Sequence, residues 1–164
     1  MNILEETPAQ LEVLGRYEIK EELGRGAMGI VYLGFDPRIA RKVAIKTHDY
    51  KQFHGEDLKE SKIRFFKEAE AAGRLSHPNI VQVFDVGEEQ GLAYIAMDFA
   101  QGVALNECIN EDSLLPPFKV YKLMADVADA LAYAHNQNIV HRDIKPGNII
   151  ADIDSCIAKV SDFG

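Results

Sequence analysis

The sequence predicts an α+β fold in two parts, an antiparallel β-sheet region that includes one helix, followed by a mainly helical region. Between residues 17 and 99, short runs of β-branched and aromatic residues alternate with turn-forming residues, which is typical of consecutive antiparallel strands. After Gly102 the pattern changes, and the longest helical repeat of apolar residues occupies 118–137. We therefore expect a hinge near Phe99–Gly102 between the two parts.

Five strands are expected in the first part, after a short lead-in at residues 1–16. The first three are joined by a glycine-rich turn and by Asp36-Pro37-Arg38, which favours an antiparallel meander. The last two are joined by the turn-forming sequence Gly-Glu-Glu-Gln-Gly. The expected strands are 17–23, 30–35, 41–50, 80–86 and 92–99.

Two helices are expected. The first covers about 58–75, where Ile63, Phe66 and Ala69 recur on one stripe, and it ends before Pro78. The second covers 118–137 and is roughly 30 Å long at 1.5 Å per residue. Two short strands, 148–152 and 156–160, are expected after it. The apolar stripe of the second helix consists of Val120, Leu123, Met124, Val127, Leu131 and Ala134.

The composition is that of a globular protein, with 47% hydrophobic and 27% charged residues among 164. The formal charge of −8 argues against nucleic-acid binding, which needs a net basic face. The apolar runs are far shorter than the ~20 residues of a membrane helix, and the first residues lack the basic and apolar parts of a secretory signal. We expect a cytoplasmic protein with no membrane segment in this chain, any anchoring lying beyond residue 164. Cys108 and Cys156 are expected to be reduced thiols.

Residues 24–31 read Gly-Arg-Gly-Ala-Met-Gly-Ile-Val, the pattern G-x-G-x-x-G-x-V. A dinucleotide-binding fold needs a helix after the last glycine, whereas the residues here predict a strand. A glycine-rich hairpin between strands can cover the phosphates of a nucleotide, because its backbone approaches them closely. An ordinary flexible hairpin is the alternative.

Lys46 follows the apolar residues Val43-Ala44-Ile45 in a predicted strand. A lysine in a strand usually faces solvent, and for this residue alone that interpretation stays open. Its spacing from the glycine pattern is that of neighbouring strands in one meander, which would bring Lys46 to the glycine turn.

The most specific pattern is His141-Arg142-Asp143-Ile144-Lys145-Pro146-Gly147-Asn148, followed fourteen residues later by Asp162-Phe163-Gly164. An ordinary polar loop does not account for this order of residues. With the glycine pattern, Lys46 and a helix glutamate, these motifs resemble the protein kinase family over residues 17–164. The surrounding sequence resembles bacterial eukaryotic-like serine/threonine protein kinases.

The resemblance implies a two-lobed protein-kinase-like fold, truncated at the Asp-Phe-Gly motif. The N-lobe with its hinge would comprise 17–101, and a partial C-lobe would comprise 102–164. Because the activation segment and the later helices would follow Gly164, we expect residues 1–164 alone to be inactive or nearly so.

The resemblance also implies residue roles. Asp143 would be the catalytic base, and Lys145 would neutralise the transferring phosphate. Lys46 would hold the α- and β-phosphates and pair with Glu68, whereas Glu70, about 200° further round the helix, would be solvated. The Mg²⁺ ligands would be Asn148 and Asp162.

The remaining residues implied for ATP binding surround the nucleotide. Leu23, Val31, Ala44 and Ile150 would enclose the adenine, although each could equally be a core residue. Met97 would be the gatekeeper, and the backbone of Asp98 and Ala100 would bond the base. No acid occurs in Gly102–Asn106, where many kinases bind the ribose, so that contact stays open. The glycine-loop members of the site would be Gly24, Arg25, Gly26, Ala27, Met28 and Gly29.

The implied activity is transfer of the γ-phosphoryl group of ATP to serine or threonine hydroxyls of protein substrates. Lys145-Pro146 is typical of serine/threonine rather than tyrosine kinases. The alternatives are a small-molecule phosphotransferase and a non-catalytic nucleotide-binding kinase-like scaffold. Such scaffolds usually lose the counterpart of Lys46, Asp143 or Asp162, and all three are present.

Overall fold

The computed structural model describes residues 11–26, 29–50, 53–89, 91–108 and 114–163, so Ala27, Met28 and Gly164 lie outside the described residues. The first part is an antiparallel sheet with the strand order β1-β2-β3-β4-β6-β5. Its strands are β1 (Val13–Leu14), β2 (Tyr17–Gly26), β3 (Gly29–Asp36), β4 (Arg41–Asp49), β5 (Val83–Glu89) and β6 (Leu92–Asp98).

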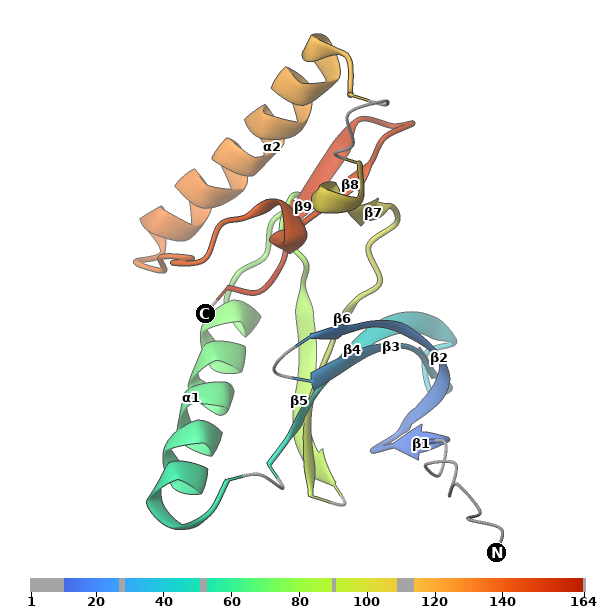
Figure 1. The fold of residues 1–164 in the computed structure, drawn as a ribbon, viewed down its shortest axis with the longest axis vertical. Coiled ribbons are helices and arrows are strands. Elements are labelled where there is room, and N and C mark those ends of the chain that lie inside the picture. The colour runs from blue at the N-terminus through green and yellow to red at the C-terminus, as the bar shows by residue number, and fades with distance from the viewer. Residues whose placement is uncertain (1–10, 27–28, 51–52, 90, 109–113, 164) are drawn as a thin grey trace, which may run out of the picture.

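The second part combines a small sheet, in the order β7-β8-β9, with the long helix α2 (Pro117–Asn136). Figure 1 shows α2 lying along this sheet, while α1 (Gly55–Gly73) lies beside the larger one. Two 3-10 helices, η1 (Leu105–Cys108) and η2 (Pro146–Asn148), lie between these elements in sequence. The strands of the small sheet are β7 (Val103–Ala104), β8 (Ile149–Asp152) and β9 (Ile157–Val160). The predicted α+β class is therefore confirmed.

Helix α1 begins three residues earlier than expected, with Glu56 and Asp57 in its first turn, where acidic groups interact favourably with the free N–H groups. Its buried stripe also differs from the predicted one. Ile63 is 54% exposed, whereas Phe65, Ala69 and Ala72 are buried. The predicted stripe was wrong at Ile63 because residues 65, 69 and 72, spaced by four and three, face the sheet.

Helix α2 packs on β9 through Leu123, Val127, Ala130 and Ala134. Val120 and Met124, both part of the predicted apolar stripe, are 40% and 37% exposed. The buried face of α2 also includes the carboxylate of Asp126, which accepts the backbone N–H of Ala158 at 3.0 Å and Lys122 Nζ at 2.8 Å. A backbone donor at the sheet needs an acceptor, and this requirement accounts for a carboxylate on the buried face of the helix.

Strand β5 begins later than expected because the residues before it pair with the second part. Val81 N–H donates to Val160 O at 2.9 Å, and Val160 N–H donates to Asn79 O at 2.8 Å. The largest core accordingly joins α2, β8 and β9 to residues around the end of α1, including Leu75 and Ile80. The segment after α1 is therefore anchored in the second part of the molecule.

No helix in the described ranges is long and apolar enough to cross a membrane. Cys108 and Cys156 are free thiols, as expected.

Candidate active site

The glycine-rich segment lies at the end of an antiparallel hairpin. Strands β2 and β3 pair up to Gly26 and Gly29, and Gly24 lies opposite Val31. Gly29 has φ +147°, and a Cβ there would lie 1.8 Å from Thr47 O, so only glycine fits. Since a strand follows the last glycine, the arrangement is not that of a dinucleotide-binding fold.

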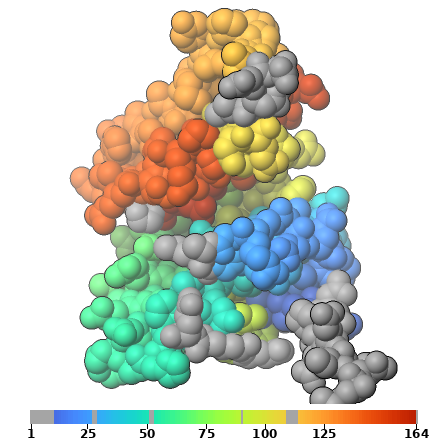
Figure 2. All heavy atoms as spheres, viewed as in Figure 1, coloured from blue at the N-terminus to red at the C-terminus, as the bar shows by residue number. Residues whose placement is uncertain are grey.

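A cleft of about 510 Å³ lies between this hairpin and the second part of the molecule. In Figure 2 the blue atoms of β2 and β3 lie directly below the yellow atoms around η1. Gly29 is not among the lining residues, and the cleft reaches the segment after β6 that was expected to be the hinge. The sequence-predicted residues that line the cleft are Leu23, Gly24, Arg25, Gly26, Val31, Ala44, Lys46, Met97, Asp98, Ala100, Ile150 and Asp162.

Several lining residues were not anticipated from the sequence. Ala104 pairs with Ile150 across β7 and β8, so the small sheet brings the residues after the hinge to the cleft. Glu107, on η1, places an acid at the cleft just beyond the region in which the sequence shows none. Some of these residues belong to segments that the sequence does single out, the hinge at 99–102 and the loop 141–148, but no local pattern assigns their side chains to the cleft. The unanticipated residues are Val81, Phe99, Gly102, Val103, Ala104, Glu107, Gly147 and Ser161.

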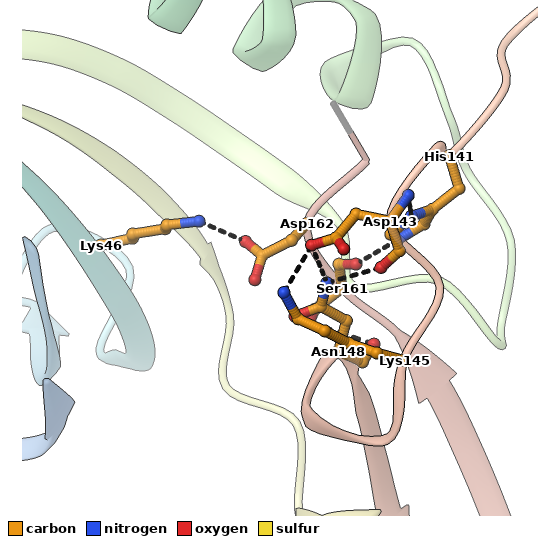
Figure 3. A network of polar contacts seen from close by, with 7 residues as sticks. All are labelled: Lys46, His141, Asp143, Lys145, Asn148, Ser161 and Asp162. Carbon is orange, nitrogen blue, oxygen red and sulfur yellow. Dashed lines mark hydrogen bonds and ion pairs between the residues drawn. The ribbon is translucent and has the colours of Figure 1, made fainter. Parts of the chain in front are cut away.

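Lys46 and Asp162 meet at this cleft. On β4, Lys46 pairs with Val31 of β3 and Ile95 of β6, and its Nζ lies 2.6 Å from Asp162 Oδ1. Figure 3 shows the Lys46 side chain reaching toward Asp162. The side chains are 29% and 35% exposed, so both stay accessible to a ligand.

The ion pair expected between Lys46 and Glu68 is not formed in this structure. Both residues line a smaller cavity of about 70 Å³, next to Met97 and Phe163, but within the described ranges Glu68 has no ion-pair partner. The Lys46 ammonium is instead neutralised by Asp162, which follows β9 and approaches from the second part. Glu70 lies on the outer side of α1 and pairs with Arg74, both being exposed.

The loop 141–148 is anchored by His141, which is buried. Its Nδ1 accepts the N–H of Asp143 at 3.2 Å, and its Nε2 lies 2.7 Å from Ser161 O. A neutral imidazole with its proton on Nε2 satisfies both contacts. The ring also packs at 4.7 Å from that of Phe163. His141 therefore holds the segment before Asp162 against the loop that carries Asp143.

Asp143, Lys145 and Asn148 form one polar group. Lys145 Nζ lies 2.6 Å from Asp143 Oδ2, and Asn148 Nδ2 donates to the same oxygen at 3.1 Å. The hydrogen bond from Lys145 outweighs burial and holds the pKa of Asp143 below its usual value of 3.8. Asp143 is therefore ionised at neutral pH and can accept a hydrogen bond from an alcohol.

Two residues of the site have left-handed backbone conformations that are unfavourable for side chains other than glycine. Arg142 has φ +69° and Asp162 has φ +59°. Such conformations cost roughly 1–3 kcal/mol each and cluster at functional sites. Arg142 directly precedes Asp143, and Asp162 is itself a predicted metal ligand, so both conformations occur within the candidate site.

The oxygen groups of Asn148 and Asp162 fit a hard divalent cation. Asn148 uses its amide nitrogen for hydrogen bonds to Asp143, which leaves its amide oxygen as a ligand. Ser161, which directly precedes Asp162, donates its N–H to Asn148 O at 2.9 Å. This backbone hydrogen bond connects the segments that carry the two candidate ligands. In the part of the chain that is described, no group of three or more His, Cys, Asp or Glu side chains could hold a metal.

The comparisons with known proteins show the family of this chain. The family model of the protein kinase domain matches residues 17–164. The chain is 42% identical over 152 residues to serine/threonine-protein kinase PrkC of Bacillus subtilis, covering 93% of this chain and 23% of that protein. It is 36% identical over 162 residues to serine/threonine-protein kinase PknB of Mycobacterium leprae, covering 96% and 25%.

Among solved structures, Rad53 in complex with AMP-PNP superposes with a TM-score of 0.76 at 24% identity, covering 91% of this chain and 38% of Rad53. At that identity the likeness concerns the fold alone. The fold is a protein-kinase-like one in which an antiparallel sheet with one helix precedes a helix and a small sheet. The chain belongs to the protein kinase family. It spans about a quarter of the length of the curated relatives it matches.

Proposed function

We propose that this chain supplies the nucleotide-binding lobe and the catalytic loop of a serine/threonine protein kinase that transfers the γ-phosphoryl group of MgATP to protein hydroxyls. The observation that carries the proposal is that Lys46 and Asp162 form an ion pair in the cleft beside the glycine hairpin, while Asp143 and Asn148, which do not line that cleft, are hydrogen-bonded to each other close to Asp162 (Figure 3). The matched relatives named as serine/threonine-protein kinases support the choice of acceptor.

Each residue has a distinct task in the proposed reaction. The adenine would lie between Leu23, Ala44 and Ile150, with the phosphates below the hairpin. Lys46 would neutralise the phosphates, and its present partner Asp162 would then be a metal ligand with Asn148. Mg²⁺, when held by these two residues, would supply positive charge that offsets the charge of the phosphates.

Asp143 would accept the hydrogen bond of the substrate hydroxyl and take its proton as the oxygen bonds to the γ-phosphorus. The bond from the γ-phosphorus to the β–γ bridging oxygen breaks, and ADP leaves. Lys145, already in contact with Asp143, would offset the charge of the transferring group. Pairing of Glu68 with Lys46 would belong to the nucleotide-bound state, because Glu68 already lines a cavity that Lys46 shares.

The proposed partners are proteins with serine or threonine acceptors, and nucleic acid is not among them, since the chain carries a net charge of −8. We place these residues in the cytoplasm, where ATP is available, with any membrane anchor outside residues 1–164.

Calorimetric titration of residues 1–164 with ATP, with and without Mg²⁺, tests the nucleotide site. The full-length protein, incubated with ATP and a protein substrate, tests the transfer. Asp143→Asn should keep nucleotide affinity within about twofold and lower the transfer rate by about a hundredfold or more. Transfer that survives this substitution would contradict the proposed base, and absence of ATP binding by the unmodified chain would contradict the proposed site.

A further inference from the structure

A second charged group lies at the hinge, apart from the residues assigned to chemistry. Asp98 ends β6, and its two carboxylate oxygens bind different partners. Arg41 Nη2 donates to Oδ1 at 2.9 Å, and Lys159 Nζ donates to Oδ2 at 2.8 Å. One carboxylate thus holds two cations.

These cations come from different parts of the molecule. Arg41 is the first residue of β4 in the large sheet, where Val43 pairs with Asp98 itself. Lys159 lies on β9 of the small sheet, opposite Ile150. Asp98 therefore connects the two sheets at the point where the chain passes from one to the other.

The ion pair between Asp98 and Lys159 lies beside a different cavity from the proposed nucleotide cleft. Lys159 and Asp98 line a separate cavity of about 280 Å³, together with Gln101 and Ile157. Neither Arg41 nor Lys159 lines the nucleotide cleft, whereas Asp98 and Ile150 line both spaces. A change at either cation therefore leaves the walls of the nucleotide cleft chemically intact.

The geometry of the group reduces the entropic cost that usually weakens surface ion pairs. Asp98 and Lys159 are only 22% and 27% exposed, and the Arg41 guanidinium stacks 4.1 Å from the ring centre of Phe84. Burial of Asp98 opposes its ionisation, but the hydrogen bonds and charges of Lys159 and Arg41 outweigh burial and lower its pKa.

We propose that Arg41, Asp98 and Lys159 form an ionic clamp that sets the angle between the two parts and thereby the width of the nucleotide cleft. They are positioning residues: they act on the hinge and touch no reacting atom. The consequence for nucleotide exchange rests on the proposed function, whereas the effect on the angle does not.

The angle is measured first, without nucleotide. Spin labels at Ile39→Cys and Asp154→Cys, in a Cys108→Ser and Cys156→Ser background, report the distance between exposed positions of the two parts. In the labelled chain, Lys159→Met should broaden the distance distribution and lengthen its mean. Lys159→Arg, which keeps the charge, should restore the original distribution.

Lys62→Met is the matched control, because Lys62 forms an ion pair of 2.6 Å with Glu88 within the first part and is 33% exposed. It should leave the distribution unchanged. Equal distributions for Lys159→Met and the unmodified chain would overturn the clamp. If Lys159→Met does not fold, the unmodified labelled chain is measured at 50 mM and 1 M NaCl; screening should broaden its distribution, and an unchanged one would equally overturn the clamp.

Nucleotide exchange is measured second, by stopped-flow dissociation of MgATP. Lys159→Met should accelerate dissociation about fivefold, and Lys62→Met should not. A Lys159→Met protein that loses melting temperature but keeps both the distance and the dissociation rate would assign Lys159 a structural role only. Failure of the unmodified chain to bind ATP would contradict the proposed function and leave the distance measurement as the test of the clamp.

Discussion

The ammonium of Lys46 lies 2.6 Å from the carboxylate of Asp162, although 116 positions separate the two residues. This pair joins the central strand β4 to the segment after β9, across the cleft that the glycine hairpin covers. In the proposed function, Lys46 is the cation that would face the phosphates and Asp162 is a ligand of the divalent cation. A ligand that binds there must replace the attraction between these two groups with interactions of its own.

Lys46→Met should weaken MgATP binding by roughly thirtyfold or more, because it removes the cation expected to face the phosphates and leaves the Asp162 carboxylate unpaired. Lys42→Met is the matched control, since Lys42 lies exposed on the same strand. Calorimetric titration of both variants measures the difference. Similar affinities for the two variants would exclude Lys46 from phosphate binding.

Asp162→Asn should remove the dependence of ATP affinity on Mg²⁺, because a neutral amide binds hard cations far more weakly than a carboxylate does. Asp154→Asn, an exposed substitution in the turn between β8 and β9, is the control and should keep the dependence. Titrations with ATP, without Mg²⁺ and with Mg²⁺ in excess over ATP, measure the ratio of affinities. An unaltered ratio in Asp162→Asn would disprove its role as a ligand.

Glu68→Gln should weaken MgATP binding by about fivefold if Glu68 pairs with Lys46 once the nucleotide is bound. Glu70→Gln should have no effect on binding, since Glu70 contacts Arg74 on the exposed side of α1. Without nucleotide, neither substitution should alter the melting temperature by more than about 2 °C. Equal affinities for Glu68→Gln and the unmodified chain would mean that Lys46 keeps Asp162 as its partner.

Gly102→Ala should lower the free energy of unfolding by about 2 kcal/mol or more. Gly102 has φ +115°, and an added Cβ would lie 2.2 Å from Ala151 O. The control is Gly73→Ala at the end of α1, where nothing lies within 4 Å of the added Cβ, and stability should stay the same or rise by up to about 1 kcal/mol. Urea denaturation compares the two, and equal stabilities would refute a tight approach of the hinge to β8.

Acid should remove the stabilisation that Asp98 provides. The folded state holds the pKa of Asp98 below its unfolded value of 3.8, so the contribution is fully present above that value and is lost as the pH falls toward the folded pKa. Asp98→Asn should therefore cost about 1 kcal/mol at pH 7, and less as the pH falls below about 3.8. Urea denaturation of both proteins between pH 7 and pH 2.5 follows the difference. A difference that grows in acid would have the wrong sign.

The sequence predicted the elements and the family because its strongest signals are local. Turn residues and apolar repeats located the strands β2 to β6 and both long helices within a few residues. The order of polar residues in 141–148 and the Asp-Phe-Gly motif indicated the kinase family, whose model matches 17–164. Such patterns depend on neighbouring residues, so they can be read without knowing where distant segments lie.

The tertiary structure decided which charged groups meet. Lys46 has both Asp162 and Glu68 beside it, and only the approach of the segment after β9 made Asp162 its partner. Likewise, β9 places Lys159 beside Asp98. Strand β7 pairs with β8, and η1, which follows β7 directly, places Glu107 at the cleft. A charge interacts with whatever lies within a few ångströms, and sheet pairing between distant segments determines that distance.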